Sequence, residues 1–210
     1  MLLDADMQWS ALVPVKAGAK SRLDPDPEVR ARLSGAFLTD VLTALTGAPQ
    51  VDEVVVVTDD AALRGEFSSR VRVHLTKARG LNAELVEALH ELGRRPVMIV
   101  AADLPCLNSD AVSCVLQLAQ STAHAFVTDT QGLGTTTLLA HTADECVPMF
   151  GARSHARHAQ AGYRELTAVN AAQSSLLVRA RRDVDTALDL WDAVRIGVGP
   201  ASTAALAEKR

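Results

Sequence analysis

A short apolar segment that ends in a carboxylate constrains the fold of this chain more than any other feature. The segment Val97–Leu107 reads Val-Met-Ile-Val-Ala-Ala-Asp-Leu-Pro-Cys-Leu. An apolar run with β-branched residues is typical of a strand buried on both faces, which in a mixed chain means a parallel sheet covered by helices. Ligands of such sheets bind just beyond the carboxyl ends of the strands. Asp103 stands there and is a candidate metal ligand, although a helix-capping or turn role explains it equally well.

Short apolar runs alternate with amphipathic stretches along the chain, which is typical of βαβ units. The predicted strands are Ala11–Val15, Glu53–Thr58, Val71–Leu75, Val97–Ala101, Ala125–Thr128 and Thr136–Ala140. The predicted helices are Glu28–Thr46, Ala61–Phe67, Asn82–Gly93, Ser109–Gln120 and, as the last one, Val184–Val194. Gly197–Pro200 is expected to break the chain before a polar end. We expect one doubly wound α/β domain over residues 1–210.

Composition narrows the class of partner. The net charge is −4 and the aromatic residues are four Phe, two Trp and one Tyr, so neither phosphate-backbone binding nor a base-stacking platform is expected. Cys106, Cys114 and Cys146 form no C-x-x-C pair and are expected to be reduced packing residues. The sequence shows no leader and no apolar run of the roughly 18 residues that a membrane span needs. We therefore expect a cytoplasmic protein that binds neither nucleic acid nor membranes.

The connection after the first predicted strand carries three cations and a glycine. It reads Lys-Ala-Gly-Ala-Lys-Ser-Arg over residues 16–22. In nucleotide-binding α/β folds this connection faces the phosphates, and a glycine lets backbone amides approach an anion. The loop matches neither the P-loop nor the dinucleotide fingerprint, and a solvated basic loop is the alternative. Its position after the first strand favours triphosphate binding.

Two further loops combine glycine with hydrogen-bond donors. Gly132–Thr137 leads into a predicted strand, and its threonine hydroxyls can donate to phosphate or carboxylate oxygens, with a plain hairpin turn as the alternative. Phe150–His158 is expected to enter a helix with Ser154 as its N-cap. The free amides of that helix start, together with the charges of Arg153, Arg157 and His158, would favour an anion. The alternative is a capped surface helix.

A pair of carboxylates precedes the last predicted helix, where residues 181–186 read Arg-Arg-Asp-Val-Asp-Thr. One of Asp183 and Asp185 is expected to reach a site while the other caps the helix. Together with Asp103, one of them can hold a hard cation such as Mg²⁺, which takes a few carboxylates along with phosphate oxygens and water. Helix capping alone is the alternative.

Taken in order, these loops resemble a known family from Leu12 to about Pro200. The segments that carry the resemblance are Val13–Lys16, Ala19–Leu23, Gly80–Asn82, Asp103–Pro105, Gly132–Thr135, Phe150–His158 and Arg182–Thr186. The set resembles the MobA-like nucleotidyltransferases and, within them, the CofC/FbiD guanylyltransferases of coenzyme F-420 biosynthesis. This resemblance implies a single-domain, three-layer αβα Rossmann-like fold of the GT-A/MobA-like type with a mostly parallel central sheet.

The resemblance also implies an activity. A Mg²⁺-dependent enzyme would transfer GMP from GTP to the phosphate of a three-carbon acid and release pyrophosphate. Phosphoenolpyruvate is the expected acceptor, because the tail Gly197–Pro200 and the Ala-rich composition resemble the actinobacterial enzymes, and 2-phospho-L-lactate and 3-phosphoglycerate are the alternatives. The product, enolpyruvoyl-2-diphospho-5'-guanosine, would pass to the next transferase of the pathway. A molybdopterin or sugar phosphate acceptor, or a catalytically inactive nucleotide-binding regulatory protein, are further alternatives.

By position, the resemblance assigns roles to individual residues. The implied Mg²⁺ ligands are Asp103, Asp183 and Asp185. The implied GTP contacts are Lys16, Lys20, Arg22 and Asn82. The implied acceptor contacts are Thr135, Gly151 and Ser154. The catalytic residues would be Asp103, Lys16 and Lys20, with the two lysines stabilising the departing pyrophosphate.

Overall fold

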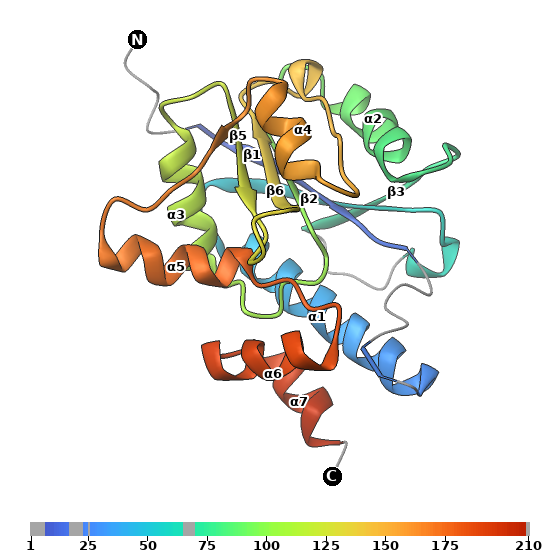
Figure 1. The fold of residues 1–210 in the computed structure, drawn as a ribbon. Coiled ribbons are helices and arrows are strands. Elements are labelled where there is room, and N and C mark those ends of the chain that lie inside the picture. Colours follow the sequence, from blue (N-terminus) through green and yellow to red (C-terminus); the bar gives the residue numbers. More distant parts are fainter. Residues whose placement is uncertain (1–6, 17–22, 25, 65–69, 209–210) are drawn as a thin grey trace.

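A mostly parallel sheet runs through the centre of the computed structural model, which describes residues 7–16, 23–24, 26–64 and 70–208 (Figure 1). Within these residues the strand order is β3-β2-β1-β4-β6-β5-β7. The strands are β1 (Trp9–Pro14), β2 (Val51–Thr58), β3 (Val71–Leu75), β4 (Val97–Val100), β5 (His124–Thr128), β6 (Thr135–Ala140) and β7 (Arg164–Glu165). Strand β6 is antiparallel to β4 and β5, and the other pairs are parallel.

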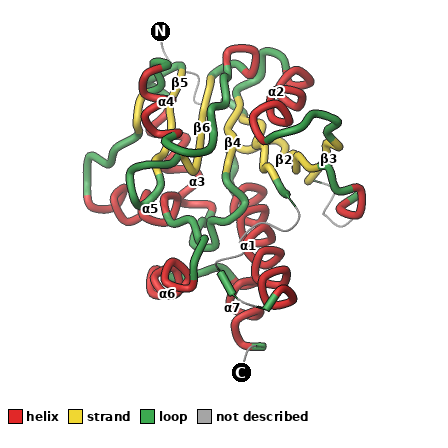
Figure 2. The backbone as a smooth tube through the Cα atoms, turned by 45° about the vertical axis from the view of Figure 1, so that its right-hand side comes forward, coloured by secondary structure: helices red, strands yellow, loops and turns green. Residues whose placement is uncertain are grey.

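Helices cover both faces of the sheet, which confirms the predicted three-layer α/β architecture (Figure 2). The helices are α1 (Pro27–Gly47), α2 (Leu81–Leu92), α3 (Ser109–Ala119), α4 (Ser154–Gln160), α5 (Ala171–Arg181), α6 (Ala187–Ile196) and α7 (Pro200–Ala207), with single 3₁₀ turns η1 (Ala61–Leu63) and η2 (Ala143–Glu145). Helices α1, α3 and α5 pack on one face, and α2 packs on the other. In the part of the chain described, no helix is long and apolar enough to cross a membrane.

The alternation of side chains along β2 shows why its continuous apolar run forms a central strand. Val54 and Val56 pack with the helices of the α1 face, whereas Val55 and Val57 pack with those of the α2 face. Successive residues of a strand point to opposite faces, so a strand buried on both sides must be apolar at every position. The same holds for β4, the strand that leads to Asp103.

The chain after α5 forms a smaller cluster against the N-terminal half of α1, away from the sheet (Figures 1 and 2). Val184 and Ala193 are fully buried there, together with Phe37 of α1. The first turn of helix α7 contacts the carboxylate of Asp40, a residue of α1 that is 4% exposed. The two carboxylate oxygens accept hydrogen bonds from the backbone N–H groups of Ala201 and Ser202, both at 2.9 Å. A side chain of α1 therefore caps the last helix.

The six predicted strands agree with the observed bounds to within two residues, but four elements of the described part were not predicted. These are the short strand β7, the 3₁₀ turn η2, helix α5 and helix α7, the last of which lies where a polar end was expected. Pro200 does not break the chain as predicted, because it occupies the first turn of α7, where proline is well tolerated. The last predicted helix begins at Ala187 instead of Val184. The predicted helix Ala61–Phe67 is a 3₁₀ turn over Ala61–Leu63, and its last residues lie outside the described part.

We expect Asp40→Ala to lower the free energy of unfolding by about 2 kcal/mol, because two N–H groups at the start of α7 lose a charged acceptor. Urea unfolding followed by circular dichroism measures this change. Asp144→Ala, which removes an exposed carboxylate, is the matched control and should unfold as the wild type does. Equal stability of the two variants would contradict the capping role of Asp40.

Candidate active site

Three of the predicted site residues lie next to strand ends at one edge of the sheet. Strands β1 and β4 are parallel neighbours, so Lys16 and Asp103 leave the sheet at the same edge. Strand β6 is antiparallel to β4, which places its first residue, Thr135, at that edge too. The ladder continues there, because Ala101 N–H donates to the Thr136 carbonyl at 2.8 Å. Thr135 thus lies across from the chain that leads into Asp103.

A backbone hydrogen bond brings the two predicted carboxylate segments together. Val184 N–H donates to the Asp103 carbonyl at 3.1 Å. Burial raises the pKa of Asp183 to about 7, and the negative charge of Asp103 adds to this rise. Asp129 and Asp185 contribute smaller like-charge effects in the same direction. These carboxylates therefore lie close enough to oppose one another's ionisation.

The arrangement is not a preformed metal cage. Among the residues described, no group of three or more His, Cys, Asp or Glu side chains is placed so that it could hold a metal ion by itself. Mg²⁺ is commonly bound by one or two carboxylates, with substrate phosphates and water completing its shell. A pair of carboxylates is therefore chemically sufficient for Mg²⁺ only when a phosphate-bearing substrate is present.

Helix capping explains none of the three predicted metal ligands. Asn108 caps α3, so the capping alternative for Asp103 is wrong. Thr186 caps α6 and forms a capping box with a carboxylate inside that helix. Our prediction that Asp183 or Asp185 caps the last helix is therefore also wrong.

Asp129 belongs to this carboxylate group, and sequence reasoning missed it. Its two oxygens accept hydrogen bonds from Leu133 N–H at 2.8 Å and Gly134 N–H at 2.7 Å. A Cβ atom on Gly134 would lie 2.5 Å from Asp129 Oδ2, so a larger residue here would displace the Asp129 carboxylate. Asp129 follows β5 directly, the same strand-end signal that marked Asp103. Its hydrogen bonds make it the residue that shapes the β5–β6 turn.

Lys16 is held by a buried acid, Glu84, that the sequence analysis did not single out. The Lys16 Nζ atom lies 3.0 Å from Glu84 Oε1, and the two side chains are 44% and 4% exposed. Gly80 N–H donates to the same oxygen at 3.1 Å. The sequence signal is an acid on the apolar stripe of α2, because such a group needs a partner when it is buried. The predicted contacts Lys20 and Arg22 lie outside the described residues.

Asn82 links the start of α2 to the loop that carries Gly151. Its Oδ1 accepts from Phe150 N–H at 2.8 Å, and its Nδ2 donates to the Phe150 carbonyl at 3.1 Å. Gly151 follows with a φ of 108°, a conformation that favours glycine. The Arg157 guanidinium donates to the carbonyls of Phe150 and Ala152 at 3.1 and 2.9 Å. These bonds position the loop, and the nucleotide contact of Asn82 stays a prediction.

Ser154 begins α4 but is not its N-cap, contrary to our prediction. The N-cap is Arg153, whose φ of 57° places it in the left-handed region. Ser154 is 2% exposed, and its N–H donates to the Gly151 carbonyl at 3.0 Å. A left-handed residue turns the chain into the helix here, so the hydroxyl of Ser154 is not consumed as a cap. Ser154 and Gly151 are thereby adjacent, and their contact with the acceptor stays a prediction.

His158 does not add positive charge to the site, contrary to our expectation. Its side chain is fully buried in α4, and Nδ1 lies 2.8 Å from the Thr135 hydroxyl. Burial lowers the pKa of His158 to about 4, and the charge of Arg157 adds to the effect. The ring is therefore neutral near pH 7. It connects α4 with Thr135, at the start of β6.

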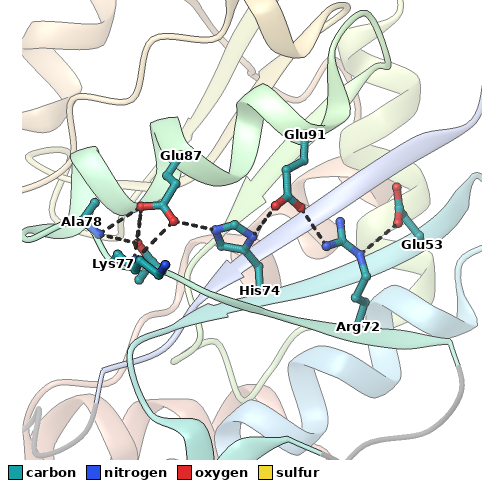
Figure 3. Close-up of polar contacts among 8 residues, drawn as sticks. Glu53, Arg72, His74, Lys77, Ala78, Glu87 and Glu91 are labelled. Carbon is teal, nitrogen blue, oxygen red and sulfur yellow. Dashed lines mark hydrogen bonds and ion pairs between the residues drawn. The ribbon is translucent and has the colours of Figure 1, made fainter.

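The turn before α2 is anchored by a row of polar side chains shown in Figure 3. The row extends from β2 across β3 to α2 and comprises Glu53, Arg72, His74, Glu87 and Glu91. Glu87 accepts hydrogen bonds from the N–H groups of Lys77, at 3.3 Å, and Ala78, at 3.0 Å. Desolvation opposes the ionisation of Glu87, but these hydrogen bonds outweigh it and lower its pKa. Glu87 thereby holds the turn that leads to Gly80 and Asn82.

Lys16, Asp103 and Thr135 therefore lie next to strand ends at one edge of the sheet. Asp183 is brought to the same place by the hydrogen bond between Val184 and Asp103. A cation and a hydroxyl suit oxyanions, and a carboxylate pair suits a hard cation shared with phosphate oxygens. The arrangement fits chemistry between two phosphate-bearing substrates.

Comparisons with known proteins identify the family and agree with the observed fold. A phosphoenolpyruvate guanylyltransferase from Streptomyces coelicolor is 40% identical over 211 residues, which cover 96% of this chain and 97% of that protein. Another of the same name, from Geodermatophilus obscurus, is 38% identical over 94% of both chains. A solved nucleotidyl transferase from Methanothermobacter is alike in fold, with a TM-score of 0.57, 17% identity, and coverage of 90% of this chain and 97% of that one. The family model described as guanylyl transferase CofC like matches residues 9–206, and the chain therefore belongs to this family.

Proposed function

We propose that the protein is a phosphoenolpyruvate guanylyltransferase of coenzyme F-420 biosynthesis. It transfers GMP from GTP to phosphoenolpyruvate and yields enolpyruvoyl-2-diphospho-5'-guanosine and pyrophosphate, and the product passes to the next transferase of the pathway. The observation that carries this proposal is that relatives with this name match nearly the whole chain. The match therefore includes the acceptor-side segments from Thr135 to Ser154 as well as the nucleotide-side loop.

The reaction needs no covalent protein intermediate. A phosphate oxygen of the acceptor attacks the α-phosphorus of GTP in line, the bond to the β-phosphate bridging oxygen breaks, and pyrophosphate leaves. Both reactants are anions, so the protein contributes mainly positioning and compensation of negative charge. In this proposal Lys16 stabilises the charge of the departing pyrophosphate. Thr135, Gly151 and Ser154 bind the acceptor acid in the same proposal.

We infer that Asp103 and Asp183 hold Mg²⁺, with Asp185 as the alternative ligand on the same segment. The donor set fits, because carboxylate oxygens are the ligands that Mg²⁺ prefers. The raised pKa of Asp183 supports the inference, since crowded carboxylates gain most from a nearby cation. When bound, the ion would supply charge neutralisation at phosphate oxygens. Asp129 is not assigned this role, because each of its oxygens already accepts a hydrogen bond from the β5–β6 turn.

The test of the acceptor is pyrophosphate release from GTP in the presence of each candidate acid. We expect turnover with phosphoenolpyruvate to exceed that with 2-phospho-L-lactate or 3-phosphoglycerate. Faster turnover with one of those two would change the assigned acid within the same reaction. Absence of release with all three would reject the proposed function.

We expect Asp103→Asn to lower GMP transfer by on the order of a thousandfold, because a metal-binding charge at the reacting phosphates is lost. Steady-state pyrophosphate release measures the loss, and circular dichroism shows whether the fold is kept. Asp52→Asn, at an exposed position of β2, is the control and should turn over normally. Turnover of Asp103→Asn close to that of the control would reject the metal role of Asp103.

Chelation of divalent ions is expected to abolish turnover, and added Mg²⁺ to restore it. In Asp183→Asn the Mg²⁺ concentration for half-maximal activity should rise about tenfold or more, because one anionic ligand is lost. The measurement is a Mg²⁺ titration of pyrophosphate release at saturating GTP and acceptor. Full turnover in excess chelator would rule out the metal.

We expect Glu84→Gln to raise the KM for GTP about tenfold, because the amide keeps the hydrogen bond from Gly80 but loses the ion pair that positions Lys16. The KM for the acceptor should change less than twofold. Initial rates at varied GTP and varied acceptor separate the two constants. Glu28→Gln, exposed on α1, is the control. An equal rise in both KM values would show that Glu84 acts on the fold and not on the triphosphate side.

A further inference from the structure

His158 determines the direction of a chain of hydrogen bonds that ends at Thr135. Met149 N–H donates to His158 Nε2 at 3.0 Å, so Nε2 is an acceptor and carries no proton. The neutral ring therefore has its proton on Nδ1. That N–H points to the Thr135 Oγ1 atom, 2.8 Å away, and the hydroxyl oxygen accepts it. The polarity of the chain thus runs from Met149 through His158 to Thr135.

This polarity assigns a role to the hydroxyl hydrogen of Thr135. A threonine hydroxyl has one hydrogen to donate, and the contact with His158 uses an oxygen lone pair instead. The hydrogen is therefore available to a third group. A group that meets it must be a hydrogen-bond acceptor, such as a carboxylate or phosphate oxygen. The pair thus presents an uncharged donor at the sheet edge that also carries Asp103.

A β-bulge turns Thr135 toward His158. The β5–β6 register passes from the pair Thr128–Thr135 to the pair Val127–Thr137, so Thr136 is the extra residue. Alternate residues of a regular strand point to the same face, so in an unbroken β6 Thr135 would share a face with Leu139. Leu139 packs in the core on the α1 side of the sheet.

The structure shows the consequence of the extra residue. Thr136 Oγ1 donates to the Ala180 carbonyl of α5 at 2.7 Å, on the α1 side of the sheet. Thr135 instead reaches His158, whose ring lies near Phe126 on the opposite side. Bulges often re-aim a side chain next to a functional site. The bulge and the buried histidine together fix both the place and the polarity of this hydroxyl.

We propose that His158 is a positioning residue that holds the Thr135 hydroxyl as a hydrogen-bond donor to an anionic oxygen of the acceptor acid. This inference rests on the proposed function, which places the acceptor at Thr135. His158 does not touch the substrate and acts only through Thr135. A purely structural role is the competing explanation, because the ring also packs against Phe150 and Tyr163.

Two substitutions of His158 separate the two hydrogen bonds. His158→Asn places an amide N–H near the position of Nδ1 and keeps the donor to Thr135. His158→Gln reaches the position of Nε2, accepts from Met149 N–H and loses that donor. We expect His158→Gln to raise the KM for phosphoenolpyruvate about tenfold with the KM for GTP changed less than twofold, and His158→Asn to remain within about threefold of wild type. His90→Gln, exposed on α2, is the matched control.

A double-mutant cycle with Thr135→Val completes the test. If His158 acts through the hydroxyl, His158→Gln should change the acceptor KM less than twofold in the Thr135→Val background. An equal effect of His158→Gln in both backgrounds, or an equal rise in the GTP constant, would overturn the inference. If Thr135→Val alone leaves the acceptor KM unchanged, the acceptor does not lie at Thr135, and both the inference and that part of the proposed function fail.

A measurement on the wild type keeps the inference testable if the His158 variants do not fold. Two-dimensional NMR of protein labelled with ¹⁵N at histidine distinguishes the Nδ1–H from the Nε2–H tautomer. We expect His158 to be the Nδ1–H tautomer near pH 7. The Nε2–H tautomer would reverse the chain of hydrogen bonds and overturn the inference.

Discussion

The rest of the site depends on the hydrogen bond from Val184 N–H to the Asp103 carbonyl, which is 3.1 Å long. It attaches the segment between α5 and α6 to the end of β4. Val184 is itself fully buried against α1 and the last helices, so apolar burial holds this segment in place. Asp183 is then forced to lie near Asp103. The free energy of that burial offsets the repulsion between two carboxylates that would otherwise separate.

The negative charges of the neighbouring carboxylates are compensated in different ways. This difference distinguishes the carboxylate with a structural role from the one proposed to bind metal. Asp129 accepts two backbone N–H groups and shapes a turn. Asp183 has its pKa raised to about 7 by burial and by the charge of Asp103, so its ionised form lacks equivalent compensation. A carboxylate whose charge is already balanced has little to gain from a cation. One that is crowded by like charge gains much, which is why the metal proposal favours Asp183 over Asp129.

The sequence predicts an element well when the pattern of residues within that element reflects its burial. Strand β4 and the segment Val54–Val57 of β2 are continuously apolar, and burial on both faces explains that pattern. Helix α5 buries only Leu177 and Ala180, so its apolar periodicity is weak. Helix α7 was not predicted for another reason. The N–H groups at its start are bonded to Asp40 of α1, which lies far away in the sequence. The elements missed are those whose support comes from distant parts of the chain.

The same distinction holds within the site. Because parallel strands end at one edge, Asp103 and Lys16 could be placed from strand positions alone. The partners could not, since Asn82 meets Phe150 across 68 residues and nothing in the sequence marks His158 as buried. Those partners decide whether a polar group donates or accepts. In a site for two anions the direction of each hydrogen bond matters as much as the position of the group. The Thr135 hydroxyl can bind an anionic oxygen only when it is the hydrogen-bond donor. The tertiary structure thus supplies the polarity of a site whose location the strand pattern already indicates.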